Sequence, residues 1–137
     1  MKTIIGLIFS ILIVSFLAPM VTEGKIRLYP TEFFIGSLIV VGFISLLTVL
    51  PIYIVLASIN QNTLKNILVS AFLIGFISIA ILLIIFRVDS LPSAQPILVE
   101  NGSFTLAGWL NVFKTSFLMG CSSMLGAMPY WAIAVRW

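Results

Sequence analysis

Among the side chains that could act as nucleophiles, one cysteine and two serines are adjacent in a single apolar stretch, Cys121, Ser122 and Ser123. A serine nucleophile needs a general base, and the sequence contains no histidine to supply one. A cysteine embedded among small apolar residues is by default a buried, unreactive thiol. The missing histidine also removes His-ligated haem and His-based zinc sites. We therefore expect no catalytic residue, no metal site and no cofactor.

Carboxylates are the other groups that could do acid–base chemistry, because two of them close together can act as an acid and a base. All the acidic residues of this chain lie between the apolar runs and close to basic residues, so solvated ion pairs are the expected arrangement. We interpret the protein as not an enzyme. The acidic residues are Glu23, Glu32, Asp89 and Glu100, and the basic residues among them are Lys25, Arg27 and Arg87.

The elements that carry these residues are apolar and unusually poor in charge. Charged residues make up 8% of the chain and hydrophobic residues 61%, whereas a soluble domain has about 25% charged residues. Four of the uncharged runs are long enough to cross a bilayer, which takes about 20 apolar residues. The sequence predicts an all-α membrane protein, a four-transmembrane-helix bundle forming a single polytopic domain over residues 1–137. The predicted spans are 3–22, 33–59, 66–86 and 115–135.

Two of these runs contain prolines that affect their interpretation. The run 3–22 follows a short basic start and has the outline of a signal peptide. Pro19 and Phe16 spoil the nearest cleavage site, so we interpret the run as a retained transmembrane helix. Pro51 lies inside the second run and removes one backbone hydrogen bond, which predicts a kink there.

The last apolar run is interrupted by Lys114, and two arrangements fit it. In the favoured one, residues 104–113 form a short interfacial helix that contains Trp109, and 115–135 cross the bilayer. Lys114 then lies at the headgroups, where it could contact a lipid or a partner protein. In the alternative, a single span starts near Phe104 and carries Lys114 near mid-depth, at a cost of about 2.5–3.5 kcal/mol.

Small residues recur at helical spacing in three of the runs. Small side chains let helix backbones approach closely in a membrane, where packing and weak hydrogen bonds drive association. The surfaces could pack within this bundle, dock a partner subunit or line a ligand pocket, and we expect them first to meet one another. The residues are Ser116, Gly120, Ser123 and Ala127 on one face of the last run, Ser122 and Gly126 beside them, Ala71 and Gly75 in the third run, and Gly36, Gly42 and Ser45 in the second.

Basic residues give only a weak preference for orientation. Lys2, Lys65 and Arg136 fall on one side of the predicted membrane, and the other four basic residues fall on the second side. The short tails and the short loop on the first side favour both termini in the cytoplasm, in a bacterial inner membrane or an equivalent one. Asn101 begins an Asn-Gly-Ser glycosylation triplet, and we interpret this match as chance because the triplet lies so close to the next apolar run.

These observations favour a non-catalytic function. Membrane lipids surround the predicted bundle, and scattered single basic residues exclude nucleic acid as a partner. We expect an accessory subunit or binding partner of another membrane protein, or a homo-oligomer. Bacterial membrane immunity proteins are an example of this class, by analogy of size and topology alone. The alternative is a small uncoupled transporter or channel formed by oligomerisation, with Ser116, Ser122 and Ser123 along its path.

Overall fold

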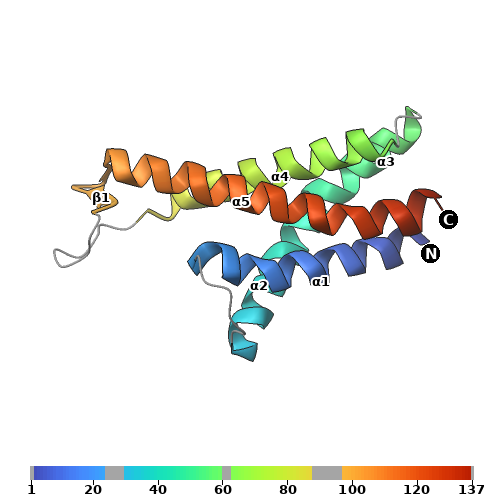
Figure 1. Cartoon of the computed structure of the whole chain (residues 1–137), viewed down its shortest axis with the longest axis horizontal. Helices are drawn as coiled ribbons and strands as arrows, with labels where there is room; N and C mark the ends of the chain where they lie inside the picture. Colours follow the sequence, from blue (N-terminus) through green and yellow to red (C-terminus); the bar gives the residue numbers. More distant parts are fainter. Residues whose placement is uncertain (1, 24–29, 60–62, 88–96, 137) are drawn as a thin grey trace.

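The computed structural model describes residues 2–23, 30–59, 63–87 and 97–136, and this part of the chain is almost entirely helical (Figure 1). Four of its helices are long and apolar enough to cross a membrane, which confirms that prediction. Three of them begin and end within two residues of the predicted runs. The elements are α1 (Lys2–Glu23), α2 (Thr31–Ile44), η1 (Ser45–Val49), α3 (Leu50–Ser58), α4 (Leu64–Ile85), β1 (Val99–Glu100), β2 (Ser103–Phe104), α5 (Leu106–Tyr130) and η2 (Trp131–Arg136).

The second apolar run is one helical rod with a local change of winding. The π-helical turn η1 joins α2 to α3 and lies directly before Pro51. Proline has no N–H and its ring crowds the carbonyl one turn earlier, so the helix widens at that point. Thr48 Oγ1 donates a hydrogen bond of 2.7 Å to the Ile44 carbonyl oxygen within the same turn. The structure thus has a π-bulge just before Pro51, and the kink predicted at this proline stays a prediction.

The last apolar helix corrects the sequence interpretation. α5 runs from Leu106 to Tyr130 without a break and continues as η2, so residues 104–113 do not form a separate interfacial helix. No proline lies between Leu106 and Lys114, and Thr105 starts the helix by accepting a hydrogen bond from the Gly108 N–H at 3.1 Å. Nothing in this segment therefore interrupts the backbone hydrogen bonds of the helix. α5 starts eight residues before Lys114.

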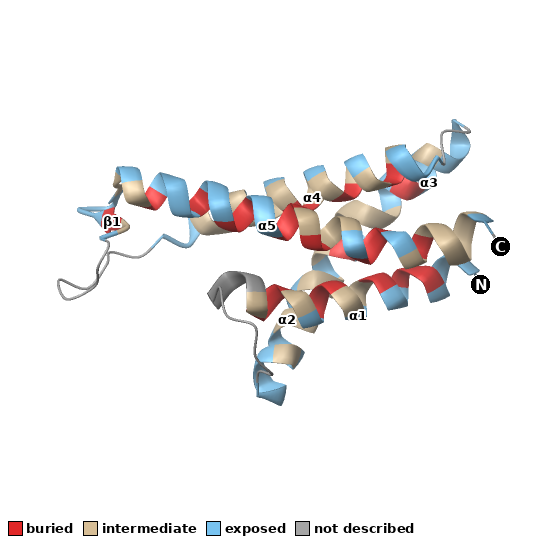
Figure 2. Cartoon of the chain, viewed as in Figure 1, coloured by how far each residue is buried: buried red, intermediate tan, exposed pale blue. Residues whose placement is uncertain are grey.

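α5 is the central helix of the bundle. It packs along α4 on one side and along α1 on another, and α2 packs against α1. In Figure 2 the buried residues follow α5 and the surfaces of α1 and α4 that face it, while α2 is exposed or half-buried along its length. The core includes Leu7, Ile67, Ala127 and Tyr130, which form one cluster with Tyr53 and Ala71.

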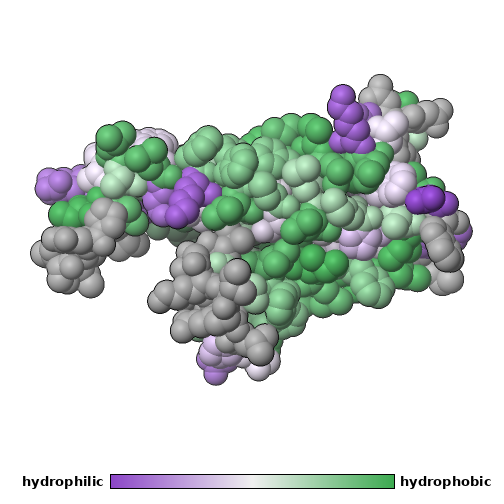
Figure 3. Space-filling model, viewed as in Figure 1, coloured by the Kyte–Doolittle hydropathy of each residue, from purple (hydrophilic) through white to green (hydrophobic). Residues whose placement is uncertain are grey.

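The two ends of the bundle differ in what they carry. The start of α1 and the end of η2 lie at one end, near the end of α3 and the start of α4 (Figure 1). The hairpin of β1 and β2 lies at the other end. Figure 3 shows a broad hydrophobic belt between these ends and hydrophilic residues near both of them. This distribution is the one expected of helices that cross a membrane.

Candidate functional site

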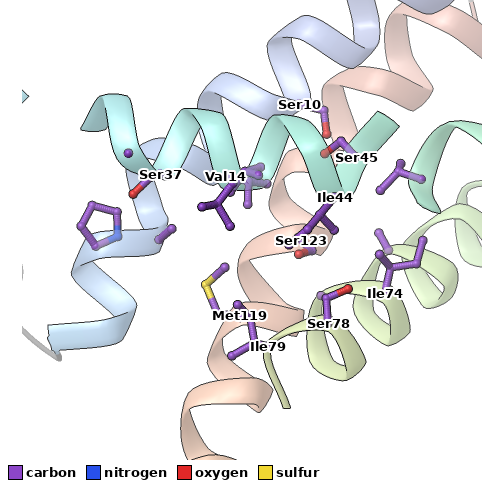
Figure 4. A pocket seen from close by; sticks show the side chains of 18 of the residues that line it. Ser10, Val14, Ser37, Ile44, Ser45, Ile74, Ser78, Ile79, Met119 and Ser123 are labelled. Atoms are coloured by element: carbon purple, nitrogen blue, oxygen red, sulfur yellow. The ribbon is translucent and has the colours of Figure 1, made fainter. Parts of the chain in front are cut away.

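A cavity lies between α1, α2, α4 and α5 (Figure 4). Its volume is about 530 Å³, within the range of about 300–1,000 Å³ usual for ligand pockets. Most of its lining is apolar, with serine hydroxyls from all four helices. The residues that line it include Ser10, Val14 and Ala18 of α1, Gly36, Ser37, Val40, Val41 and Ile44 of α2, Ala71, Ile74, Gly75, Ser78 and Ile79 of α4, and Met119 and Ser123 of α5, together with Glu32, Ser45 and Tyr53.

The cavity exists because α2 packs against α1 and lies apart from α4 and α5, which pack closely on each other. None of the fourteen residues of α2 is buried, whereas Ser45 in η1 and Tyr53 in α3 are. The Tyr53 ring stacks on the Tyr130 ring with centroids 4.2 Å apart, which joins α3 to α5. Beyond the π-bulge, α2 diverges from α4 and α5 and leaves the cavity open beside α4.

Close packing of small residues closes the opposite side of the cavity, where α4 meets α5. A Cβ atom added at Gly75 would overlap Ser123 Oγ and lie 3.0 Å from the Met119 carbonyl oxygen. A Cβ added at Gly120 would lie 2.8 Å from two carbons of the Phe72 ring. Both glycines are buried, and so the two backbones approach to a distance that any larger residue would prevent.

A second small-residue contact joins α5 to α1. A Cβ added at Gly126 would overlap a methyl group of Val14 and lie 3.1 Å from the Ser10 carbonyl oxygen. Gly6 of α1 faces the Tyr130 backbone in the same way, because a Cβ added at Gly6 would lie 3.2 Å from the Tyr130 Cα. The two faces predicted on the last run thus pack on different neighbours, Gly120 on α4 and Gly126 on α1.

The remaining small residues of the predicted set differ in their roles. Ser116 is fully buried and its hydroxyl has no hydrogen-bond partner, like that of Ser15 in α1. Ser122 donates a hydrogen bond of 3.0 Å to the Leu118 carbonyl oxygen of its own helix. Ala127 is buried in the core cluster. Only Ser123 of the three serines in the suggested transport path lines the cavity.

The glycines of α2 do not pack as predicted. No atom lies within 4 Å of a Cβ added at Gly36 or at Gly42, so the expected contact of this surface with the other small-residue faces is not made. Gly36 lines the cavity and Gly42 does not. The reason is the divergence of α2, which the periodicity of small residues in one sequence does not reveal.

Lys114 and Cys121 lie outside the cavity lining. Lys114 is exposed on α5, and Cys121 is a free, half-buried thiol. The backbone rise from Lys114 to Arg136 is about 33 Å at 1.5 Å per residue, close to the roughly 30 Å thickness of a hydrocarbon core. The ion pairs predicted between the apolar runs fall mostly outside the described residues. These leave out Lys25, Arg27, Asp89 and the side chain of Glu23.

A two-residue hairpin precedes α5 and was missed in the sequence interpretation. Asn101 and Gly102 have φ values of 49° and 73°, the left-handed pair that a tight Asn-Gly hairpin turn requires. Thr105 Oγ1 donates a 2.6 Å hydrogen bond to the Ile97 carbonyl oxygen. The Leu98 carbonyl oxygen lies where a Cβ of Gly108 would be, so the hairpin rests directly on the first turn of α5.

Comparison of the chain with protein-family models, with curated proteins and with solved structures found no match.

Proposed function

We propose that this chain is a non-catalytic integral membrane protein that acts as an accessory subunit or binding partner of another membrane protein. The observation that carries the proposal is the position of α2, which buries none of its fourteen residues on its own chain. By comparison, ten residues of α5 are buried. A long apolar helix that is so little used inside the bundle is available to another helix.

The surface of α2 and η1 that points away from the cavity has the spacing of a helix-packing seam. We call Ile35, Ile39 and Gly42 of α2 and Leu46 of η1 the outer stripe; they follow one another at +4, +3 and +4 positions. The three large side chains are 52%, 64% and 58% exposed, respectively. Open space above Gly42 provides a hole into which a knob of a partner helix could fit.

The same proposal includes the location of the protein. Both termini face the cytoplasm, in a bacterial inner membrane or an equivalent one, and Lys114 lies at the headgroups of the opposite face. The described residues agree with a shared side for the termini, because the start of α1 and the end of η2 lie at one end of the bundle (Figure 1). A second copy of the chain is the simplest partner, since an isologous contact would use the outer stripe twice.

The test compares two identical substitutions on one helix. Gly42→Leu fills the hole in the outer stripe, whereas Gly36→Leu places the same side chain in the cavity, and neither added Cβ meets another atom. We expect the full-length protein, purified in mild detergent with its partner or with a differently tagged copy, to lose that companion on Gly42→Leu and to retain it on Gly36→Leu. Equal retention by both variants would refute the role of the outer stripe.

The second candidate is a small uncoupled transporter or channel formed by oligomerisation. It is favoured by the serine hydroxyls that reach the cavity from four helices, since uncharged pores can use hydroxyl and backbone groups. The mainly apolar lining of the cavity favours the first candidate instead. Flux of ions and small solutes into liposomes containing the purified protein would distinguish them, because only the second candidate predicts flux above that of empty liposomes.

A further inference from the structure

The cavity has the dimensions of an elongated slot. Its lining on the second span extends from Glu32 in the first turn of α2 to Tyr53 in α3, twenty-one residues along the helix. At 1.5 Å per residue this length is about 30 Å, which is also about the thickness of the hydrocarbon core of a bilayer. The cavity therefore follows the second span along most of its length.

The cross-section of the slot decides what could occupy it. A volume of about 530 Å³ spread over about 30 Å gives a mean cross-section of about 18 Å² for the centre of a water-sized sphere, so the free width between the walls is about 8 Å. An α-helix with its side chains is about 10–12 Å in diameter. The slot is therefore too narrow for a helix and wide enough for an extended hydrocarbon chain.

The chemistry and the opening of the slot agree with its width. Val14, Val41, Ile79 and Met119 supply apolar walls from four helices, and Val41 and Ile79 pack against the small cluster of Val14, Ala18 and Met119. Figure 4 shows Val14, Ile79 and Met119 around one space, with α2 on one side and α4 and α5 on the other. Because α2 packs along α1 and has no comparable packing with α4, the slot opens sideways between α2 and α4. An opening in that direction leads into the lipid when the helices cross a membrane.

Small side chains on α2 leave part of the slot empty of protein. Gly36 and Ser37 line the slot, and no atom lies within 4 Å of a Cβ added at Gly36. The same side of α2 carries Val41, which is one of the apolar walls. Ile35 and Ile39 lie exposed on the outside of α2. A larger side chain at Gly36 would therefore fill the slot.

From this geometry we infer that the slot binds one acyl chain of a membrane phospholipid, which enters sideways between α2 and α4 and lies along the second span. Glu32 marks one end of the slot, at the start of α2, where the headgroup of such a lipid would lie. This binding site is separate from the outer stripe proposed for a partner protein, because Gly36 lines the slot and Gly42 does not. The two proposals can therefore fail independently.

The test uses phosphatidylcholine that carries a photoactivatable diazirine in one acyl chain. The full-length protein is reconstituted into vesicles containing this lipid, irradiated, and digested so that labelled residues can be identified by mass spectrometry. We expect labels on Val41, Ile79 and Met119 in the slot, in addition to labels on Leu73 and Ile77, which are 49% and 50% exposed on α4 and report on the surrounding bilayer.

The variants make the test specific. Gly36→Leu should abolish labelling of the slot residues and leave Leu73 and Ile77 labelled, while Gly42→Leu should leave both sets unchanged. Ser37→Leu is a second slot-filling variant, used if Gly36→Leu does not retain its helical circular-dichroism spectrum. Absence of label from the slot residues of the unmodified protein, or equal labelling in the slot-filling and Gly42→Leu variants, would overturn the inference. Labelling by a diazirine fatty acid but not by the phospholipid would overturn the assignment to a membrane phospholipid.

Discussion

The packing of α5 on α4 leads to a prediction whose magnitude follows from the contacts of Gly120. In Gly120→Ala the new methyl group would lie 2.8 Å from two carbons of the Phe72 ring and 3.1 Å from the Phe72 carbonyl oxygen. The ring is not free to move aside, because it stacks on Phe76 with centroids 6.0 Å apart and meets the edge of Phe117 at 5.6 Å. The carbonyl belongs to the backbone of α4. Relief of the overlap therefore requires the two helices to separate.

A matched substitution isolates the energy of this contact. Glycine to alanine in a helix gains about 0.5–1 kcal/mol from backbone entropy alone, and Gly42→Ala should show this gain because no atom lies within 4 Å of the added Cβ. Overpacking of a tight contact costs about 1–3 kcal/mol. Because both variants share the entropic gain, we expect Gly120→Ala to be less stable than Gly42→Ala by about 1–3 kcal/mol.

The assay is reversible unfolding of the purified protein in mixed micelles with increasing sodium dodecyl sulfate, followed by circular dichroism. Gly120→Leu should extend the effect, while Leu125→Ile, at a residue 51% exposed on α5, should change the unfolding free energy little. If Gly120→Ala were as stable as Gly42→Ala, the close approach of α4 and α5 would be refuted, and with it the account of how the slot is closed on that side.

Three further predictions concern topology, the start of α5 and Lys114. Single cysteines placed at Lys65 and Glu100, in a variant lacking Cys121, should react with a membrane-impermeant maleimide from opposite sides of sealed vesicles; labelling of both from one side would contradict four crossings. Thr105→Ala removes the cap of Gly108 and the bond to the Ile97 carbonyl, so it should destabilise the protein by about 1–2 kcal/mol and speed amide hydrogen exchange at residues 106–108, whereas Thr105→Ser should restore protection. Lys114→Gln should insert and retain its partner like the unmodified protein, because the exposed amine lies at the headgroups in our proposal; loss of the partner with folding intact would instead place Lys114 in the interface, where an unpaired partner charge costs roughly 3–5 kcal/mol.

The helices of this fold were predictable because their determinants are local. Each predicted span is a run without charge, and the length of such a run compared with the thickness of a bilayer is enough to place it. α4 starts two residues before the predicted run, directly after Thr63, whose hydroxyl accepts a hydrogen bond from the Asn66 N–H. The error at the fourth span came from treating Lys114 as a boundary, although a lysine does not interrupt a helix backbone.

The candidate site was not predictable, because it results from contacts between residues far apart in the chain. Small residues at Gly75, Gly120 and Gly126 could be recognised as packing positions, but their partners could not be assigned from spacing alone. The slot exists because α2 takes part in none of these close glycine contacts. The hairpin could have been predicted, since Asn101-Gly102 is a strong signal for a tight turn. We interpreted this pair only as evidence against a helix.

The position of α5 at the centre of the bundle has a consequence for how the protein is made. In membrane proteins, helices first insert and then associate side by side. α5 follows α1 and α4 in the chain, yet it supplies the surfaces on which they pack, through Gly126 and Gly120 respectively. In the proposed membrane location, α1 and α4 therefore remain in the bilayer without their main packing surface until translation reaches residues 106–136. Their assembly waits for the synthesis of α5, and a nascent chain that stops before α5 offers its unpaired faces to membrane quality-control proteases.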